Sequence, residues 1–153
     1  MNVNIKKIDI RDVKILYKWV NAEDSLTNKI ITKYKIDVKS HVKWVRRYLT
    51  SGNKNSIWII LLNNKRVGQL RMDVKSNEKV FITDIFLEAK FRGSGIANIA
   101  YQKLIVEMKK KYFDYEIIAN IKKKNKNSQS FFKRLGFKFI KEERNFYVFK
   151  KFL

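Results

Sequence analysis

The feature that most restricts the fold is a glycine-rich turn joining a strand pattern directly to a helix pattern. Residues 80–87 (VFITDIFL) are rich in β-branched and aromatic side chains, which predicts a buried strand. The turn Arg92-Gly93-Ser94-Gly95 follows, and apolar residues then recur at helical spacing from Ile96 to Met108. Such a turn presents several backbone N–H groups and the positive end of a helix dipole to one point. The pattern therefore predicts an anion-binding loop or, as the alternative, a tight turn that binds no ligand.

The residues after the glycines narrow the kind of anion site. No Gly-Lys-Ser/Thr sequence follows, so the turn does not match the loop of triphosphate-binding proteins. The third glycine of a dinucleotide-binding turn is missing as well. The chain has no cysteine and a single histidine, His41, which excludes a thiolate or multi-histidine metal site. We therefore expect no bound metal.

The other patterns predict an α/β (α+β) fold in which residues 1–153 form a single domain. No repeat, proline or low-complexity linker marks a second domain. The predicted order is β-α-α-β-β-β-α-β-α-β-β, with the second, third and fourth strands as antiparallel neighbours. Strands are expected at 3–8, 57–62, 66–74, 80–87, 115–121, 137–141 and 146–152. Helices are expected at 13–20, 40–49, 96–108 and 127–135.

Local signals define the ends of these elements. We expect Asp9 or Asp12 to cap the first helix, Ser40 to begin the second and Gly136 to end the last in a left-handed conformation. The polar stretch 21–34 is expected to be irregular. Turns are expected at Asn63-Asn64, at Ser76-Asn77-Glu78 and at Ser51-Gly52.

The net charge of +21, from 35 Lys and Arg against 14 Asp and Glu, has two explanations. It fits attraction to anions, namely nucleic acid, an anionic membrane surface or small phosphorylated ligands. It fits equally a mutational bias toward lysine, because the lysines are spread along the whole chain. No apolar run approaches the roughly 18 residues of a membrane-spanning helix. We expect a cytoplasmic protein with no membrane and no nucleic-acid partner, either a monomer or a homodimer.

Two segments resemble the motifs of one enzyme family. Residues 92–97 (RGSGIA) are similar to the pyrophosphate-binding Arg/Gln-x-x-Gly-x-Gly/Ala motif of the GNAT superfamily of acyl-CoA-dependent N-acyltransferases. Residues 125–137 (NKNSQSFFKRLGF) resemble the second motif of that family, at the family's spacing. The resemblance implies the GNAT fold, with a mixed, mostly antiparallel sheet whose fourth and fifth strands part to admit acetyl-CoA.

The resemblance also implies which residues hold the cofactor. Backbone groups near the end of the fourth strand would pair with the pantetheine arm, the glycine turn would hold the pyrophosphate, and the second motif would line the pantetheine and the thioester. The implied residues are Phe86, Leu87, Arg92, Gly93, Ser94, Gly95, Ile96, Ala97, Asn125, Ser128, Phe131 and Phe132. For Phe131, plain core packing at helical spacing is the alternative.

The chemistry that the resemblance implies is direct attack of a neutral amine on the thioester carbonyl, so a group must accept the ammonium proton. Asp84 is the only carboxylate within residues 80–87, and Thr83 beside it could position a water. A structural hydrogen bond for Asp84 and a route through water are the alternatives. Many relatives have a tyrosine where this chain has Phe132, which cannot donate a proton. The thiolate therefore takes its proton from another group or leaves without one.

Three short patterns upstream of the glycine turn indicate the acceptor, namely residues 19–21 (WVN), 41–44 (HVKW) and 67–73 (VGQLRMD). They resemble a GNAT branch that acetylates nucleotide-activated amino sugars, including the 4-amino-sugar enzymes of pseudaminic acid biosynthesis. The implied acceptor residues are Trp19, Asn21, His41, Trp44, Gln69 and Arg71. In an extended strand Gln69, Arg71 and Asp73 share one face, where an arginine can hold a diphosphate and Trp44 can stack on a ring. Core packing for Trp44 and a solvent-facing strand for Arg71 are the alternatives.

Two other functions compete with this interpretation. One is an N-acetyltransferase acting on protein or peptide N-termini, resembling the ribosomal-protein enzymes. The other is a nucleic-acid-binding module on a degenerate acyltransferase fold. The intact glycine turn, and the lack of a single basic helix interleaved with stacking aromatic residues, favour an enzyme over the latter.

Overall fold

Seven strands form one mixed sheet that organises the protein. The computed structural model describes residues 1–153 apart from 31–33, 51, 53 and 76. The strands lie in the order β1-β2-β3-β4-β5-β7-β6, and every neighbouring pair is antiparallel except β4 and β5. Their bounds are β1 Val3–Lys7, β2 Ser56–Leu62, β3 Lys65–Val74, β4 Val80–Leu87, β5 Glu116–Lys122, β6 Lys138–Glu142 and β7 Phe146–Phe152.

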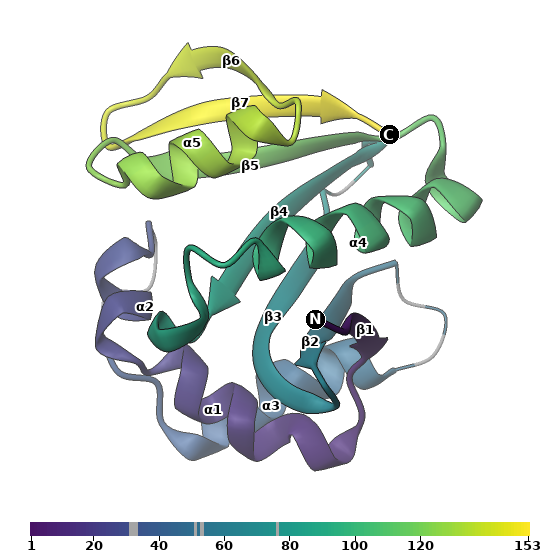
Figure 1. The fold of residues 1–153 in the computed structure, drawn as a ribbon, viewed down its shortest axis with the longest axis vertical. Coiled ribbons are helices and arrows are strands. Elements are labelled where there is room, and N and C mark those ends of the chain that lie inside the picture. Colours follow the sequence, from purple (N-terminus) through teal and green to yellow (C-terminus); the bar gives the residue numbers. More distant parts are fainter. Residues whose placement is uncertain (31–33, 51, 53, 76) are drawn as a thin grey trace.

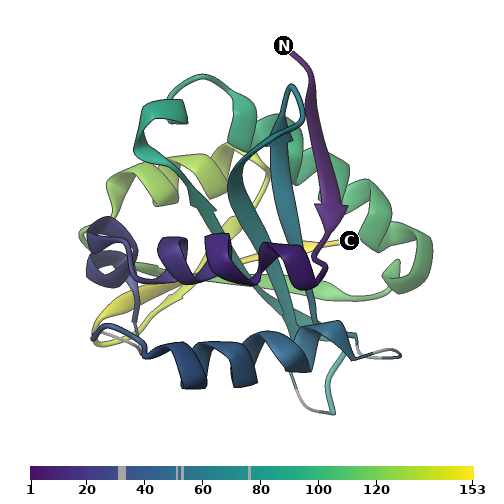
Figure 2. The ribbon, with the colours of Figure 1, turned by 90° about the horizontal axis from the view of Figure 1, so that it is seen from below.

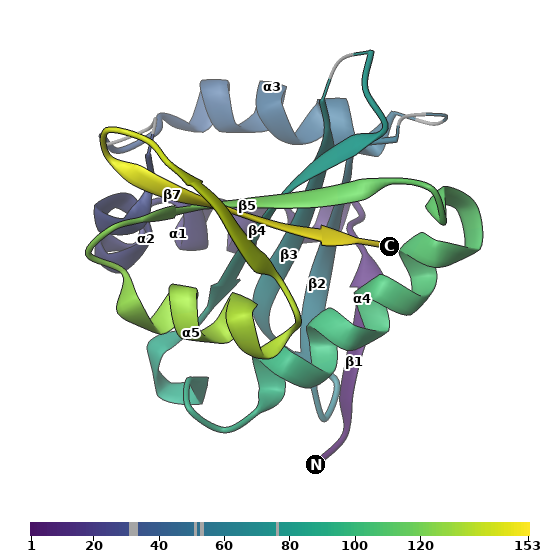
Figure 3. The same ribbon diagram turned by 90° about the horizontal axis from the view of Figure 1, so that it is seen from above.

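Helices cover both faces of the sheet (Figures 2 and 3). On one face lie α1 (Val13–Val20), α2 (Glu23–Asn28) and α3 (Val38–Leu49). On the other lie α4 (Ile96–Tyr112) and α5 (Lys126–Arg134). A buried apolar cluster fills each side, the larger one beneath α4 and α5 and the smaller one beneath α1 and α3. None of the helices in the described part of the chain is long and apolar enough to span a membrane.

The sheet splits between β4 and β5, as predicted. The two strands pair only where they begin, through residues 80–82 of β4 and 116–118 of β5. By contrast, β4 pairs with β3 along nearly its whole length, and β5 pairs with all of β7. Figure 1 shows β4 running diagonally between the β1–β3 part of the sheet and the β5–β7 part. From Thr83 onward β4 therefore has no partner strand on its β5 side.

The predicted element order is confirmed, with one helix added. Residues 23–28 of the stretch expected to be irregular form α2. Its single large apolar residue, Leu26, gives no periodic pattern, so the sequence carried no helical signal there. The start of α3 also differs from expectation, because Asp37 rather than Ser40 is its cap and accepts a hydrogen bond from the backbone N–H of Ser40.

Most of the predicted turns are found. Asn63 and Asn64 join β2 to β3 with φ of 47° and 66°, values typical of a type I′ hairpin. Gly136 ends α5 with φ of 85°, and Phe137 N–H donates to the carbonyl of Phe132, as in a Schellman motif. In the two other predicted turns, Ser51 and Ser76 lie outside the described residues.

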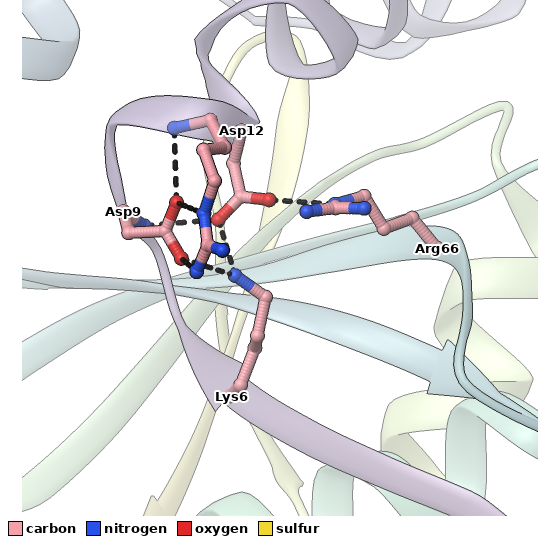
Figure 4. Close-up of polar contacts among 5 residues, drawn as sticks. Lys6, Asp9, Asp12 and Arg66 are labelled. Atoms are coloured by element: carbon pink, nitrogen blue, oxygen red, sulfur yellow. Dashed lines mark hydrogen bonds and ion pairs between the residues drawn. The ribbon is translucent and has the colours of Figure 1, made fainter.

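A network of charged side chains fixes the link between β1 and α1 (Figure 4). Asp9 accepts from the backbone of Arg11 and caps a single 3₁₀ turn, and the fully buried Asp12 accepts in return from the backbone of Asp9. Lys6 and Arg66 each lie 2.6 Å from a carboxylate oxygen of Asp12. Burial alone would raise the pKa of Asp12, but these hydrogen bonds outweigh it and lower the pKa.

Candidate active site

The glycine turn leaves the N-terminus of α4 open. Gly93 and Gly95 have φ of 74° and 82°, in the left-handed region that other residues rarely adopt. Gly95 is the N-cap of α4 and provides no side-chain hydrogen bond, and the first turn of the helix holds no acidic residue. By contrast, Asn125 caps α5 and Asp37 caps α3 through their side chains. The free backbone N–H groups and the helix dipole of α4 therefore suit an anion.

The side chains of the turn hold its shape. Arg92 donates from Nε to the carbonyl of Leu87 at 2.8 Å and forms an ion pair with Asp24 of α2. Ser94 donates from Oγ to the carbonyl of Phe91 at 2.6 Å. The backbone N–H of Arg92 donates to the carbonyl of Ala89 at 3.1 Å, so of the residues that the resemblance implies, the backbone amides of 93–97 are the groups left for a pyrophosphate.

Aromatic residues pack behind the split. Phe132 is buried, and its ring lies 5.8 Å from that of Tyr101, which also contacts Phe131. In the second motif, Asn125 accepts from the backbone of Ser128 at 3.1 Å and so begins α5. The motif thus places Phe131 and Phe132 beside the parting strands and gives its polar residues a capping role.

Thr83 and Asp84 lie on opposite faces of β4, because successive side chains of a strand alternate. The hydroxyl of Thr83 accepts from Tyr101 Oη at 2.9 Å and donates to the carbonyl of Arg71 at 3.2 Å. Burial raises the pKa of Tyr101. Asp84 faces α3 instead, with its side chain 47% exposed. The structure therefore does not bring the two together, which corrects the expectation that Thr83 orders a water for Asp84.

A polar cluster surrounds Asp84 on that face. Arg71 lies opposite Asp84 in the register of β3 and β4, with Nη2 3.8 Å from Asp84 Oδ2. Its Nε lies 3.0 Å from Asp73 Oδ2, and its guanidinium carbon lies 5.8 Å from the ring centre of Trp44. Tyr48 of α3 donates to Asp73 Oδ1 at 2.6 Å. Gln69, Arg71 and Asp73 thus share the face that the alternation predicts.

The three other predicted acceptor residues bind neighbouring elements. Trp19 donates from Nε1 to Glu88 at 2.9 Å. The amide of Asn21 both donates to and accepts from the backbone of Ile36. The ring of His41 is buried with Nε2 2.9 Å from the carbonyl of Val13, and burial lowers its pKa despite that carbonyl. The structure gives these side chains the role of joining α1, α3 and the segments around them.

Sequence reasoning missed three polar residues of this face, namely Lys29, Tyr48 and Glu88. Tyr48 follows Trp44 by four residues and so lies on the same face of α3, a spacing that could have revealed it. Lys29 carried no such signal. It follows α2 and donates from Nζ to the carbonyl of Val20 at 3.0 Å, and burial lowers its pKa although Asp84 opposes this.

A pocket of about 290 Å³ lies between α2 and the end of β5, lined by Glu23, Leu26, Thr27 and Lys122. Lys122 donates to the carbonyl of Thr27 at 2.5 Å, which ties the two parts of the molecule together across this pocket. Within the described residues, no group of three His, Cys, Asp or Glu side chains gathers where it could hold a metal ion.

Comparison with solved structures places this arrangement among known folds. A domain from Methanocaldococcus jannaschii is similar with a TM-score of 0.85 and 24% identity, covering 99% of each chain. The yncA protein of Salmonella typhimurium, solved with its cofactor acetyl-CoA, is similar with a TM-score of 0.79 and 16% identity, covering all of this chain and 95% of its own. The split sheet and the open helix N-terminus thus define the fold of acyl-CoA-dependent N-acetyltransferases.

The amino-acid sequence also matches the acetyltransferases. The profile of the Acetyltransferase (GNAT) family matches residues 17–137, and the chain belongs to this family. It is also 27% identical over 141 residues to an uncharacterized N-acetyltransferase of Methanocaldococcus jannaschii. That match covers 88% of this chain and 58% of the relative, so the chain spans little more than half of the relative's length.

Proposed function

We propose that this protein transfers the acetyl group of acetyl-CoA to the 4-amino group of a UDP-linked amino-deoxy sugar. The donor would lie along the split on the side of α4 and α5. Backbone groups of Phe86 and Leu87 would pair with its pantetheine arm, and the backbone of residues 93–97 would bind its pyrophosphate. Asn125, Ser128, Phe131 and Phe132 would border the pantetheine.

The acceptor amine would meet the thioester from the other face of β4. Asp84 takes the ammonium proton, directly or through a water, because its half-exposed carboxylate is the one that β4 presents to this face. The neutral amine then attacks the carbonyl and a C–N bond forms. The C–S bond breaks to release the CoA thiolate, and the second proton lost by the amine nitrogen goes to this thiolate or to solvent. A backbone N–H of β4 beyond residue 82 supplies the hydrogen bond to the oxyanion, since no neighbouring strand occupies that side.

The observation that carries the choice of acceptor is an unsatisfied amide beside this carboxylate. Gln69 is 5% exposed, and among the described residues its Oε1 has no hydrogen-bond partner. A buried acceptor atom without a partner is unfavourable, which a ligand hydroxyl or N–H would correct. Arg71, two residues along the same face, offers N–H groups to a phosphate, and the ring of Trp44 offers a stacking surface. Hydroxyls, an anionic group and a planar ring together describe a nucleotide sugar.

The test is release of CoA from acetyl-CoA by the purified protein with different amines. UDP-linked 4-amino-4,6-dideoxy sugars are compared with the free amino sugars and with N-terminal peptides at equal concentration. We expect the nucleotide-linked sugars alone to accelerate release, and Gln69→Leu to raise the KM for them while leaving the KM for acetyl-CoA unchanged. Acceleration by peptides alone would instead establish a protein N-acetyltransferase.

A further inference from the structure

We infer that Tyr48 and Asp73 are positioning residues that fix the guanidinium of Arg71, and through it the orientation of the acceptor beside Asp84. This inference rests on the proposed function, since it assigns a task to the acceptor face. Neither residue touches the reacting atoms. Their effect passes through Arg71, which is the group between them and Asp84.

The geometry forms a chain from α3 to β4. Tyr48 Oη donates to one oxygen of Asp73 at 2.6 Å, and the other oxygen of Asp73 lies 3.0 Å from Arg71 Nε. The far end of the guanidinium lies 3.8 Å from Asp84. Asp73 is thus held by Tyr48 on one side and draws Arg71 on the other. With both oxygens of Asp73 engaged, the guanidinium keeps its Nη groups toward Asp84 and the acceptor.

Packing of α3 on the sheet does not by itself explain this chain. The ring of Tyr48 already contacts the ring of Trp44 at 5.0 Å, and a phenylalanine would keep that contact. The Tyr48 hydroxyl adds only the bond to Asp73, and burial together with the Asp73 carboxylate raises its pKa, so it stays protonated and donates. The Nε–H of Arg71 is buried and not directed at Asp73, so the pair holds the guanidinium by charge rather than by a hydrogen bond.

Tyr48→Phe tests the inference, with Tyr17→Phe as the matched control. Tyr17 is also half-buried on this face and packs against the ring of His41. Its variant therefore removes a hydroxyl without altering the contacts among Tyr48, Asp73 and Arg71. The first measurement is the ¹⁵Nε order parameter of Arg71 in the ligand-free protein. We expect a value above about 0.8 in the parent and in Tyr17→Phe, falling below about 0.6 in Tyr48→Phe.

Steady-state kinetics give the second measurement. Tyr48→Phe is expected to raise the KM for the UDP-linked amino sugar about tenfold, with the KM for acetyl-CoA unchanged. In the background of Arg71→Gln, which removes the positive charge that Asp73 holds, the same change should have almost no further effect.

The two measurements separate failure of this inference from failure of the proposed function. An Arg71 order parameter that is equal in the parent and in Tyr48→Phe would overturn the positioning role, whatever the substrate. Additive effects of Tyr48→Phe and Arg71→Gln, or an equal rise in both KM values, would also overturn it. If the order parameter falls as expected but no nucleotide sugar is acetylated, the positioning stands and the acceptor assignment fails.

Discussion

The helix α4 begins differently from the helices that precede and follow it. Asp37 caps α3 and Asn125 caps α5 with a side-chain oxygen, and a buried network around Asp12 precedes α1. At α4 the corresponding position is Gly95, in a left-handed conformation with no side-chain cap. A side-chain cap typically stabilises a helix by about 1 kcal/mol, and α4, the longest helix, lacks one.

The comparison identifies α4 as a helix whose first backbone N–H groups are not capped by a side chain and are free to bind a ligand. The N–H groups that a cap would satisfy in α4 are those that the family motif assigns to a pyrophosphate. At the starts of α3 and α5, the side chains of Asp37 and Asn125 occupy one such N–H group each. Substitutions at the uncapped (open) start of α4 should therefore affect ligand binding, whereas substitutions at a helix start held by side chains (closed) should affect the stability of the fold.

The largest effect is expected at the open start. Gly95→Glu should abolish binding of acetyl-CoA, because it places a carboxylate where the pyrophosphate would lie and forces a non-glycine residue to φ near 82°. In the part of the chain that the structure describes, no atom lies within 4 Å of a Cβ built there, so the fold should persist. Calorimetric titration with acetyl-CoA measures the loss.

The matched control for this variant is Gly52→Glu. Gly52 has φ of 78° and, like Gly95, no atom of the described residues within 4 Å of its added Cβ, but it lies in the connection between α3 and β2. The Gly52→Glu variant introduces the same backbone strain and the same negative charge at a position outside the glycine turn. Acetyl-CoA affinity should stay at the parental value there, and equal losses in the two variants would remove the glycine turn from the binding site.

Asp84→Asn should separate catalysis from this binding site. We expect kcat at neutral pH to fall by about 100-fold, because an amide cannot accept the ammonium proton. The acetyl-CoA affinity should not change, since Asp84 lies on the face opposite α4. Asp114→Asn, which removes a surface carboxylate paired with Lys79, is the control and should retain full turnover. Near-parental turnover of Asp84→Asn would exclude Asp84 as the base.

The sequence predicted the donor side of the molecule better than the acceptor side, for a physical reason. The glycine turn and the cap of α5 are local structures, so the residues that make them are neighbours in the chain. The acceptor face joins Arg71 of β3, Tyr48 of α3 and Asp84 of β4, which only the tertiary fold brings together. Strand alternation did place Arg71 correctly, but nothing local showed that Thr83 would bind Tyr101 instead of serving Asp84.

At a closed start, Asp12→Asn should lower the free energy of unfolding by about 2 kcal/mol, because a buried amide cannot satisfy both Lys6 and Arg66. The folded-state pKa of Asp12 is lowered, so its stabilisation is complete above the ordinary value of 3.8 and is lost as the pH falls through the lower folded value. Urea unfolding at pH 7 and pH 3 should show a smaller difference in the variant. Glu107→Gln, at a surface pair with Lys110, should change stability by less than about 0.5 kcal/mol.

The smallest effect, and the sharpest contrast with Gly95, is expected at the start of α3. Asp37→Ala removes the hydrogen bond to the N–H of Ser40 and should lower the free energy of unfolding by about 1 kcal/mol. Asp37→Asn keeps an oxygen that can accept this bond, so it should cost only a few tenths of that amount, about 0.3 kcal/mol. Neither variant should alter acetyl-CoA affinity, because the N–H groups of α3 face no ligand. A loss of affinity in Asp37→Ala equal to that in Gly95→Glu would show that acetyl-CoA binding responds to helix ends in general, and the distinction between open and closed helix starts would then fail.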